Sequence, residues 1–464
     1  MSVANVLMIV GALVGAILAF RGLFRPFLGL VVLMTLHFIQ PGELIPALAP
    51  LRIELIYGIL MLVTLLWTKA SVIGQLIKTD SIVRATIFLE GVVILTIPFA
   101  IWRGGALEAA MQLIKLIILQ LLMTFFIDSQ DRLRSILWLL WGFMMWFAGS
   151  AFLAYSRGEF YTVNGVQRAE GINSMVGGPN ELAGLLLALL PFVLALLLCS
   201  KGTAKKLVLF GSAGFGFFVL LLTGARISLV ALMAMGIFAI LRSKRKILNL
   251  TVALVIALTV WFSLPAQYQK RYLTVKQYAE GGQLDDSNKF RLQIWDAGWK
   301  MIKDHPILGV GAGQFPTAYG TIYAHRLHTA WMNPHNLFLQ VTAELGIVGL
   351  LVFSYFVIQI WKVNGWVLRE TKSPSFLVNH AFATACYFMM VGIGIVSTVS
   401  HTLYRPYWYL LAGLVAANRA VTSKMLEEGV AGEGELDDEH RDSDDALGRL
   451  QPEWHAPAYT KMQR

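Results

Sequence analysis

Most of the polar chemistry of this otherwise apolar chain is concentrated between Arg291 and Gly349. This segment contains a Trp-rich amphipathic helix, a Gly-rich turn, a polar insert with His325 and His328, and a His ahead of an apolar run. Charged groups held at a membrane are costly, so they usually mark a working site. We therefore expect the reaction to take place here.

His335 is the candidate catalytic residue. It follows Asn333 and Pro334 and precedes an apolar run that begins at Leu337. Because Asn is a good N-cap and Pro favours the first helical turn, His335 is expected in the first turn of a helix. The partial positive charge of a helix N-terminus keeps imidazole neutral, as a general base must be. An interfacial His bonded to a neighbouring loop would give the same pattern.

Two arginines are candidates for binding a phosphate group. Arg226 ends the turn Thr223-Gly224-Ala225-Arg226, which is too short for anything but a tight hairpin between two apolar runs. Arg291 begins a helix that is expected to lie in the membrane interface. The predicted apolar side of this helix consists of Leu292, Trp295, Trp299 and Ile302. Guanidinium groups bind phosphate with paired hydrogen bonds, although arginines that only anchor a helix at the membrane surface look the same.

The Gly-rich turn from Gly309 to Gly313 invites a nucleotide-binding interpretation. It lacks the Lys-Ser/Thr pair and the strand–turn–helix setting of a P-loop, so close backbone packing is the better account. The polar residues nearby also lack the helical spacing of metal ligands; these are His305, His325, His328 and Asp304. No metal and no other cofactor is predicted.

The elements that must position these residues are membrane helices. Hydrophobic residues make up 56% of the 464 residues and charged residues 14%, well below the usual quarter. Because a helix needs roughly 20 residues to cross the hydrocarbon core, the recurring apolar runs predict an all-α polytopic membrane protein with about 12–13 transmembrane helices. The predicted spans are Val3–Phe20, Phe24–His37, Ile53–Trp67, Ile82–Trp102, Leu107–Ile127, Ile136–Tyr155, Glu181–Cys199, Leu207–Thr223, Ile227–Leu241, Ile247–Leu264, Leu337–Trp361, Phe382–Val399 and Tyr404–Ala417.

The distribution of basic residues predicts the orientation of the chain. Short loops rich in Lys and Arg, such as those around Arg132 and Lys205, are expected in the cytoplasm, which places Arg226, Arg291 and His335 outside. Residues 1–20 lack a basic leading region and a cleavage site, so they are expected to form a retained helix. Both cysteines fall inside predicted helices, and no disulfide framework is predicted.

Five segments are predicted. N-terminal transmembrane helices occupy 1–155, and central transmembrane helices with a periplasmic loop at 156–180 occupy 156–264. A long periplasmic loop containing amphipathic helices covers 265–336, and C-terminal transmembrane helices cover 337–418. The acidic tail at 419–464 has almost no aliphatic periodicity and is expected to be a disordered cytoplasmic segment. The basic residues of the two outer loops would either anchor lipid headgroups or bind an anionic, lipid-attached substrate.

Several of these segments resemble the O-antigen ligase and polymerase superfamily of bacterial inner-membrane glycosyltransferases. The resemblance is carried by the segment from Arg291 to Phe315, by Pro334-His335-Asn336 and by Glu344-Leu345-Gly346. Thr223-Gly224-Ala225-Arg226 is similar to that family's Thr-Gly-Ser-Arg hairpin, with Ala225 in place of Ser. Gly178-Pro179-Asn180-Glu181 also resembles a family feature, whereas the N-terminal spans match only in hydropathy.

The resemblance implies an O-antigen ligase that transfers a glycan from undecaprenyl pyrophosphate to a hydroxyl of lipid A–core at the periplasmic face of the inner membrane. The transfer would invert the anomeric configuration and would need no metal. By position, His335 would deprotonate the acceptor, and Arg226 and Arg291 would bind the pyrophosphate. Arg168 and Asn180 are further candidates for substrate binding. The expected partners are donor, acceptor and membrane lipids, with no nucleic acid.

Three alternatives remain open. A polymerase of the same superfamily would extend the lipid-linked chain, and a protein O-oligosaccharyltransferase would use a protein acceptor. A transporter for an anionic solute should show internal repeats and charged or broken helices near the bilayer midplane. The main mid-span charges are Glu90 and Lys115, and the sequence has no obvious repeat.

Overall fold

The computed structural model describes residues 3–163, 165–243, 245–248, 250–251, 254, 258, 262, 266–269, 286–323 and 331–448. It is 82% helical, which confirms the all-α class. The exception is a small antiparallel hairpin of β1 (Tyr161–Val163) and β2 (Val166–Arg168).

The helices before the hairpin are α1 (Val3–Phe24), α2 (Pro26–Ile39), α3 (Pro41–Leu44), η1 (Pro46–Leu51), α4 (Ile53–Thr79), α5 (Ser81–Thr96), η2 (Ile97–Phe99), α6 (Arg103–Phe126) and α7 (Gln130–Ser156). Those after it are α8 (Pro179–Cys199), α9 (Thr203–Leu222), α10 (Arg226–Arg242), α13 (Asp286–Asp304), α14 (Phe315–Ala318), η3 (Tyr319–Tyr323), α15 (Leu337–Glu370), η4 (Pro374–Phe376), α16 (Leu377–Val396) and α17 (Pro406–Gly448).

Within the described residues, eight helices are long and apolar enough to cross a membrane, which makes the chain a multi-pass membrane protein. The sequence predicted 12 or 13. The predicted spans in α2 and α10 are helices of 14 and 17 residues, shorter than the roughly 20 that a full crossing needs. Most of the predicted span Ile247–Leu264 lies outside the described residues.

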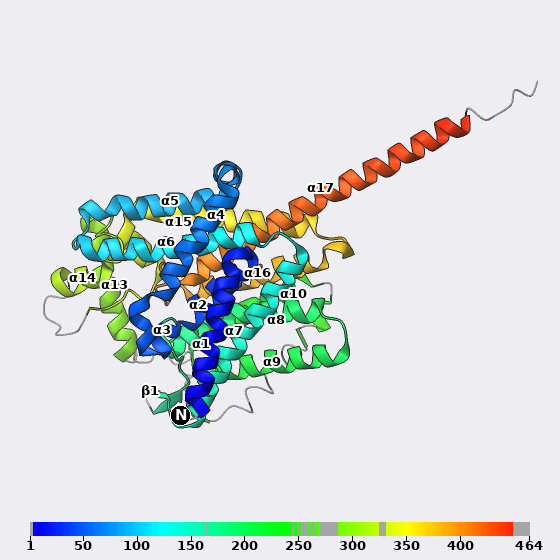
Figure 1. Cartoon of the computed structure of the whole chain (residues 1–464). Helices are drawn as coiled ribbons and strands as arrows, with labels where there is room; N and C mark the ends of the chain where they lie inside the picture. The colour runs from blue at the N-terminus through cyan, green and yellow to red at the C-terminus, as the bar shows by residue number, and fades with distance from the viewer. Residues whose placement is uncertain are drawn as a thin grey trace, which may run out of the picture.

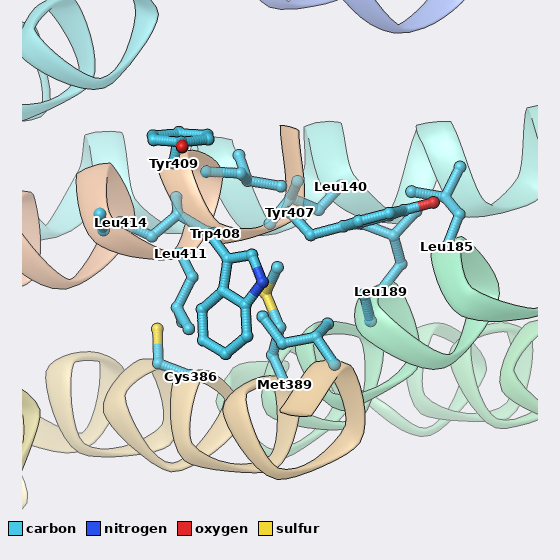
Figure 2. Packing of buried hydrophobic residues seen from close by; sticks show 14 of the residues in the cluster. Leu140, Leu185, Leu189, Cys386, Met389, Tyr407, Trp408, Tyr409, Leu411 and Leu414 are labelled. Carbon is cyan, nitrogen blue, oxygen red and sulfur yellow. The ribbon is translucent and has the colours of Figure 1, made fainter. Parts of the chain in front are cut away.

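The core of the bundle surrounds α8, the most deeply buried of the spans. Its run of Leu and Ala residues is apolar on every side, as a helix enclosed by other helices must be. It packs against α7, α9 and α16. The first turn of α17 enters this core: Figure 2 shows Tyr407 near Leu185 and Leu189, and Trp408 above Met389.

The two ends of the bundle carry different chemistry. One end, which we call the site end, gathers the starts of α6, α8, α10 and α15 and the loop between α16 and α17. At the other end, Gln130 Nε2 donates to Asn379 Oδ1 at 2.6 Å. There too, Arg419 forms an ion pair with the buried Asp80 at 3.2 Å. Short helices α13 and α14 lie against α15 at the site end (Figure 1).

The end of α17 differs from the sequence prediction. Residues 419–464 were expected to be disordered, whereas α17 continues to Gly448 and projects away from the body of the molecule (Figure 1). Glu, Lys and Ala are good helix formers, and Lys424 and Glu428 form an i,i+4 pair at 3.7 Å. Near its start this segment still packs against the core through Val421 and Met425, and local propensity extends the helix beyond them.

Candidate functional site

His335 lies just before α15, not in its first turn as the sequence predicted. Asn336, rather than Asn333, is the N-cap: its Oδ1 accepts a hydrogen bond from Leu339 N at 3.0 Å. His335 has a positive φ of 47°, a conformation that non-glycine residues seldom adopt. Leu337 N donates to Ser397 O at 2.9 Å, which ties the start of α15 to the end of α16. The His335 ring is therefore presented from a turn that is held between α15 and the end of α16.

Helix α13 brings Arg291 to this turn. Trp295 Nε1 donates to Pro334 O at 3.0 Å, so α13 is fastened to the residue before His335. Arg291 is one turn earlier on the same side of α13 as Trp295, because residues four apart are neighbours on a helix. The positive charge of Arg291 acts on His335, so the structure brings the two predicted residues within electrostatic range of each other.

The predicted apolar side of α13 is split in the structure. Ile294 and Met301 pack inward, and Gly298 allows close approach of Leu339 from α15. Leu292 and Trp299 point away from this contact and are 51% and 60% exposed. Trp295 and Ile302, which are also on the predicted apolar side, are partly buried against the same cluster. The exposed pair is suited to a membrane surface.

The surroundings of His335 favour a neutral imidazole. Burial first, and then the charge of Arg291, hold the pKa of His335 below its ordinary value, while the carboxylate of Glu181 acts in the opposite direction. The sequence predicted that a helix N-terminus would keep the His335 imidazole neutral. In the structure, burial and the neighbouring Arg291 have this effect instead. Glu181 belongs to α8, where its carboxylate folds back over Gly178.

A second histidine, which the sequence analysis missed, contacts His335. The His401 ring lies edge to face against the His335 ring, with 5.3 Å between centroids. Burial, with the charges of His335 and Arg405, lowers the pKa of His401 to about 3. Its Nδ1 is buried without a hydrogen-bond partner among the described residues. The one available signal was its place in the short loop 400–403 between two predicted spans.

Arg168 and Asn180, the other predicted site residues, contact each other. Arg168 is 5% exposed; its Nη2 donates to Asn180 Oδ1 at 2.9 Å and its Nε to Thr223 O at 2.6 Å. Arg168 therefore joins the hairpin to the start of α8 and to the turn between α9 and α10. Their role as substrate-binding residues stays a prediction, and the structure gives Arg168 a positioning role.

Arg226 is the first residue of α10, directly after the turn that Arg168 holds. The turn is as tight as the sequence predicted: Gly224 has a φ of 58° and Ala225 is the N-cap residue of α10. The half-buried Arg226 side chain thus begins three residues after Thr223, whose carbonyl Arg168 links to Asn180 of α8. These contacts connect Arg226 with the elements around His335.

The Gly-rich turn packs against a break in α15, as a tight-turn interpretation predicts. Gly346 interrupts α15 with a φ of 65° and a ψ of −165°. Val310 N and Gly311 N donate to the carbonyls of Ala343 and Glu344 at 2.9 and 3.0 Å, and Ile347 N donates to Pro306 O at 2.9 Å. The backbone groups that the break exposes are satisfied by the turn.

Glu344 fixes this packing from within α15. Its Oε2 accepts hydrogen bonds from Gly313 N and from the Tyr404 hydroxyl, each at 2.9 Å. The same glutamate thus holds both the Gly-rich turn and the loop that carries His401. The similarity of Glu344-Leu345-Gly346 to the superfamily therefore has a structural explanation: Glu344 holds the neighbouring loops, and Gly346 forms the break in α15.

The described part of the chain contains no group of three or more His, Cys, Asp or Glu side chains that could hold a metal ion. Metal independence stays a prediction. His325 and His328 lie outside the described residues. Cys199 and Cys386 are both free thiols, in agreement with the predicted lack of a disulfide.

Comparisons with known proteins agree with the resemblance seen in the sequence. Residues 209–354 match the family model described as O-antigen ligase. A protein of Rickettsia conorii named "Putative polysaccharide ligase" is 28% identical over 124 residues, which cover 25% of this chain and 28% of that protein. A protein of the same name from Rickettsia typhi is 27% identical over 152 residues, covering 32% of this chain and 33% of its own length.

These matches support the resemblance to the O-antigen ligase superfamily. The chain aligns with about a third or less of the length of these relatives. The matched family segment runs from α9 into α15 and includes Arg226, Arg291 and His335.

Proposed function

We propose that this protein is an O-antigen ligase: an inverting, metal-independent glycosyltransferase that moves a glycan from undecaprenyl pyrophosphate to a hydroxyl of lipid A–core. The reaction takes place at the periplasmic face of the bacterial inner membrane. One observation carries the proposal: a half-buried His335, whose surroundings keep it neutral, lies near Arg291 at the site end. Helix α13 brings Arg291 there, and the hydrogen bond from Trp295 to Pro334 fastens this helix beside His335.

Each residue has a separate task in this reaction. His335 takes the proton from the acceptor hydroxyl, whose oxygen then attacks the anomeric carbon of the donor. The bond between that carbon and the pyrophosphate oxygen breaks, and the pyrophosphate leaves with the electron pair. Arg226 and Arg291 stabilise the charge that develops on it, which is electrostatic catalysis by fixed cations. Attack from the side opposite the leaving group inverts the anomeric configuration.

Product analysis with purified full-length protein tests the proposal. Undecaprenyl-pyrophosphate-linked glycan and rough lipopolysaccharide, which lacks O-antigen, are supplied with and without excess EDTA. We expect glycan on lipid A–core at an equal rate in both samples. Activity that EDTA removes and Mg²⁺ restores would reveal a metal-dependent reaction.

The same assay distinguishes a ligase from a polymerase and from a protein oligosaccharyltransferase. A polymerase would produce a longer undecaprenyl-linked glycan and leave the rough lipopolysaccharide unchanged. Transfer to a protein instead would identify an oligosaccharyltransferase. Either product would overturn the ligase proposal.

A further inference from the structure

A polar cavity of about 410 Å³ lies beside His335, on the side of His401. Its volume falls within the roughly 300–1,000 Å³ of small-molecule sites. It is bounded by Glu108 and Gln112 of α6, by Asn333 two residues before His335, and by His401 and Arg405. His401 separates it from a smaller cavity at Asn180 and Glu181. The cavity therefore connects with the candidate site through the His335–His401 ring contact.

Three polar groups in this cavity have no protein partner in the described part of the chain. Glu108 and Asn333 make neither a hydrogen bond nor an ion pair there, and His401 Nδ1 is a buried atom without a partner. Buried polar atoms in folded proteins are nearly always hydrogen-bonded, so the buried Nδ1 atom of His401 points to a polar ligand. Glu108 and Asn333 are exposed side chains at the edge of the cavity, where both are free to contact the same ligand.

Two other polar side chains of the cavity are already engaged. Gln112 Nε2 donates to Tyr404 O at 3.2 Å, and Arg405 donates to Ser174 O and Met175 O, each at 3.2 Å. These contacts fix Gln112, Tyr404 and Arg405 in the wall of the cavity. Preorganised groups bind a ligand at a lower entropic cost.

The unpartnered groups suit a neutral ligand with many hydroxyls. A hydroxyl can donate to the Glu108 carboxylate and accept from the Asn333 amide. Neither Arg226 nor Arg291 lines the cavity, so it lacks the cations that the proposed function assigns to pyrophosphate. We propose that this cavity binds a sugar of the acceptor and turns one of its hydroxyls toward His335. This inference rests on the proposed function, because it identifies the acceptor side of the same site.

A larger groove provides room for the lipid that carries this sugar. It has a volume of about 750 Å³, lies between α4 and α6, and shares Glu108 and Gln112 with the polar cavity. Its walls include Ile59, Ile114 and Ile118, the first two of which are 48% and 39% exposed. From Glu108 to Ile118 the groove follows α6 for about 15 Å. A glycolipid thus fits with its sugar in the cavity and its acyl chains in the groove.

Steady-state kinetics of Glu108→Gln and Asn333→Ala test this inference with rough lipopolysaccharide as the acceptor. We expect the acceptor KM to rise about tenfold for Glu108→Gln and a few-fold for Asn333→Ala, since hydrogen bonds to charged groups are the stronger ones. The donor Kd should remain within about twofold. Asp131→Asn at the opposite end of the bundle is the matched control, because it removes one carboxylate with 94% exposure.

Two results would overturn the inference. An unchanged acceptor KM in both variants would mean that the cavity does not hold the acceptor. A donor Kd weakened as much as the acceptor KM would assign the cavity to the donor glycan.

Direct binding of delipidated core oligosaccharide separates this inference from the proposed function. If the wild-type protein transfers nothing but binds this oligosaccharide, and Glu108→Gln weakens binding about tenfold, the sugar site stands without the ligase activity. If transfer occurs while oligosaccharide binding is equal in both proteins, the ligase proposal stands and this inference fails.

Discussion

At the scale of single residues, the proposed chemistry depends on a histidine that stays neutral beside a cation. Residue type and neighbouring sequence were sufficient to select His335, Arg226 and Arg291. The φ of 47° at His335 could not be predicted, because it follows from Asn336 taking the N-cap position of α15. The contact with His401 was also hidden, since it depends on the packing of α15 against the loop after α16.

The charges around His335 predict opposite effects of two substitutions on the pH dependence of transfer. The ascending limb of kcat/KM against pH follows deprotonation of the base in the free enzyme. Glu181 raises the pKa of His335, so Glu181→Gln should move the limb to lower pH. Arg291 lowers it, so the residual activity of Arg291→Ala should rise at higher pH. If the limb stays in place in both variants, another group is the base.

At the scale of elements, the site depends on contacts between segments that are distant in the sequence. The existence of most helices was predictable from apolar runs, and the close packing of the Gly-rich turn from its composition. The break at Gly346 was not predictable, because the run from Leu337 to Trp361 reads as one uninterrupted helix. It becomes favourable only when the carbonyl of Pro306 is present to accept from Ile347 N.

Gly346→Ala should destabilise the protein and separate the Gly-rich turn from α15. The φ and ψ of Gly346 are almost exclusive to glycine, and an added Cβ would lie 2.1 Å from Ile307 O. Strained backbone of this kind costs about 1–3 kcal/mol, before the clash is added. The midpoint of thermal unfolding measures the effect. Gly214→Ala is the control: it lies in α9 with open space around it and should be neutral or stabilising by up to about 1 kcal/mol. Equal midpoints for the two variants would contradict the proposed packing.

At the scale of the whole molecule, the bundle separates its two ends by chemistry. Arg226 and His335 lie at the site end, and Lys205 at the start of α9 and Arg369 at the end of α15 lie at the opposite end. This separation is the pattern expected from the positive-inside rule, with the site end outside. The orientation itself stays a prediction. The acidic continuation of α17 was the clearest difference from the sequence prediction. Its acidic composition had indicated disorder, whereas the helix propensity of its residues favours a helix.

Single cysteines test this orientation in intact spheroplasts, on a background without Cys199 and Cys386. Thr398→Cys, in an exposed position at the site end, should react with a membrane-impermeant thiol reagent. Lys205→Cys at the opposite end should react only after permeabilisation. The reverse pattern would place the site in the cytoplasm and remove the periplasmic reaction.

Donor affinity measured together with single-turnover transfer tests the central claim most directly. In His335→Ala we expect donor binding to remain near the wild-type value while transfer falls by about 10²–10⁴-fold, the usual effect of removing a general base. Arg226→Ala and Arg291→Ala should also weaken donor binding, and Lys should restore it poorly, since a point charge cannot reproduce paired phosphate contacts. If His335→Ala loses donor binding as severely as the arginine variants while single-turnover transfer stays normal, His335 is not the base and the proposed division of roles is wrong.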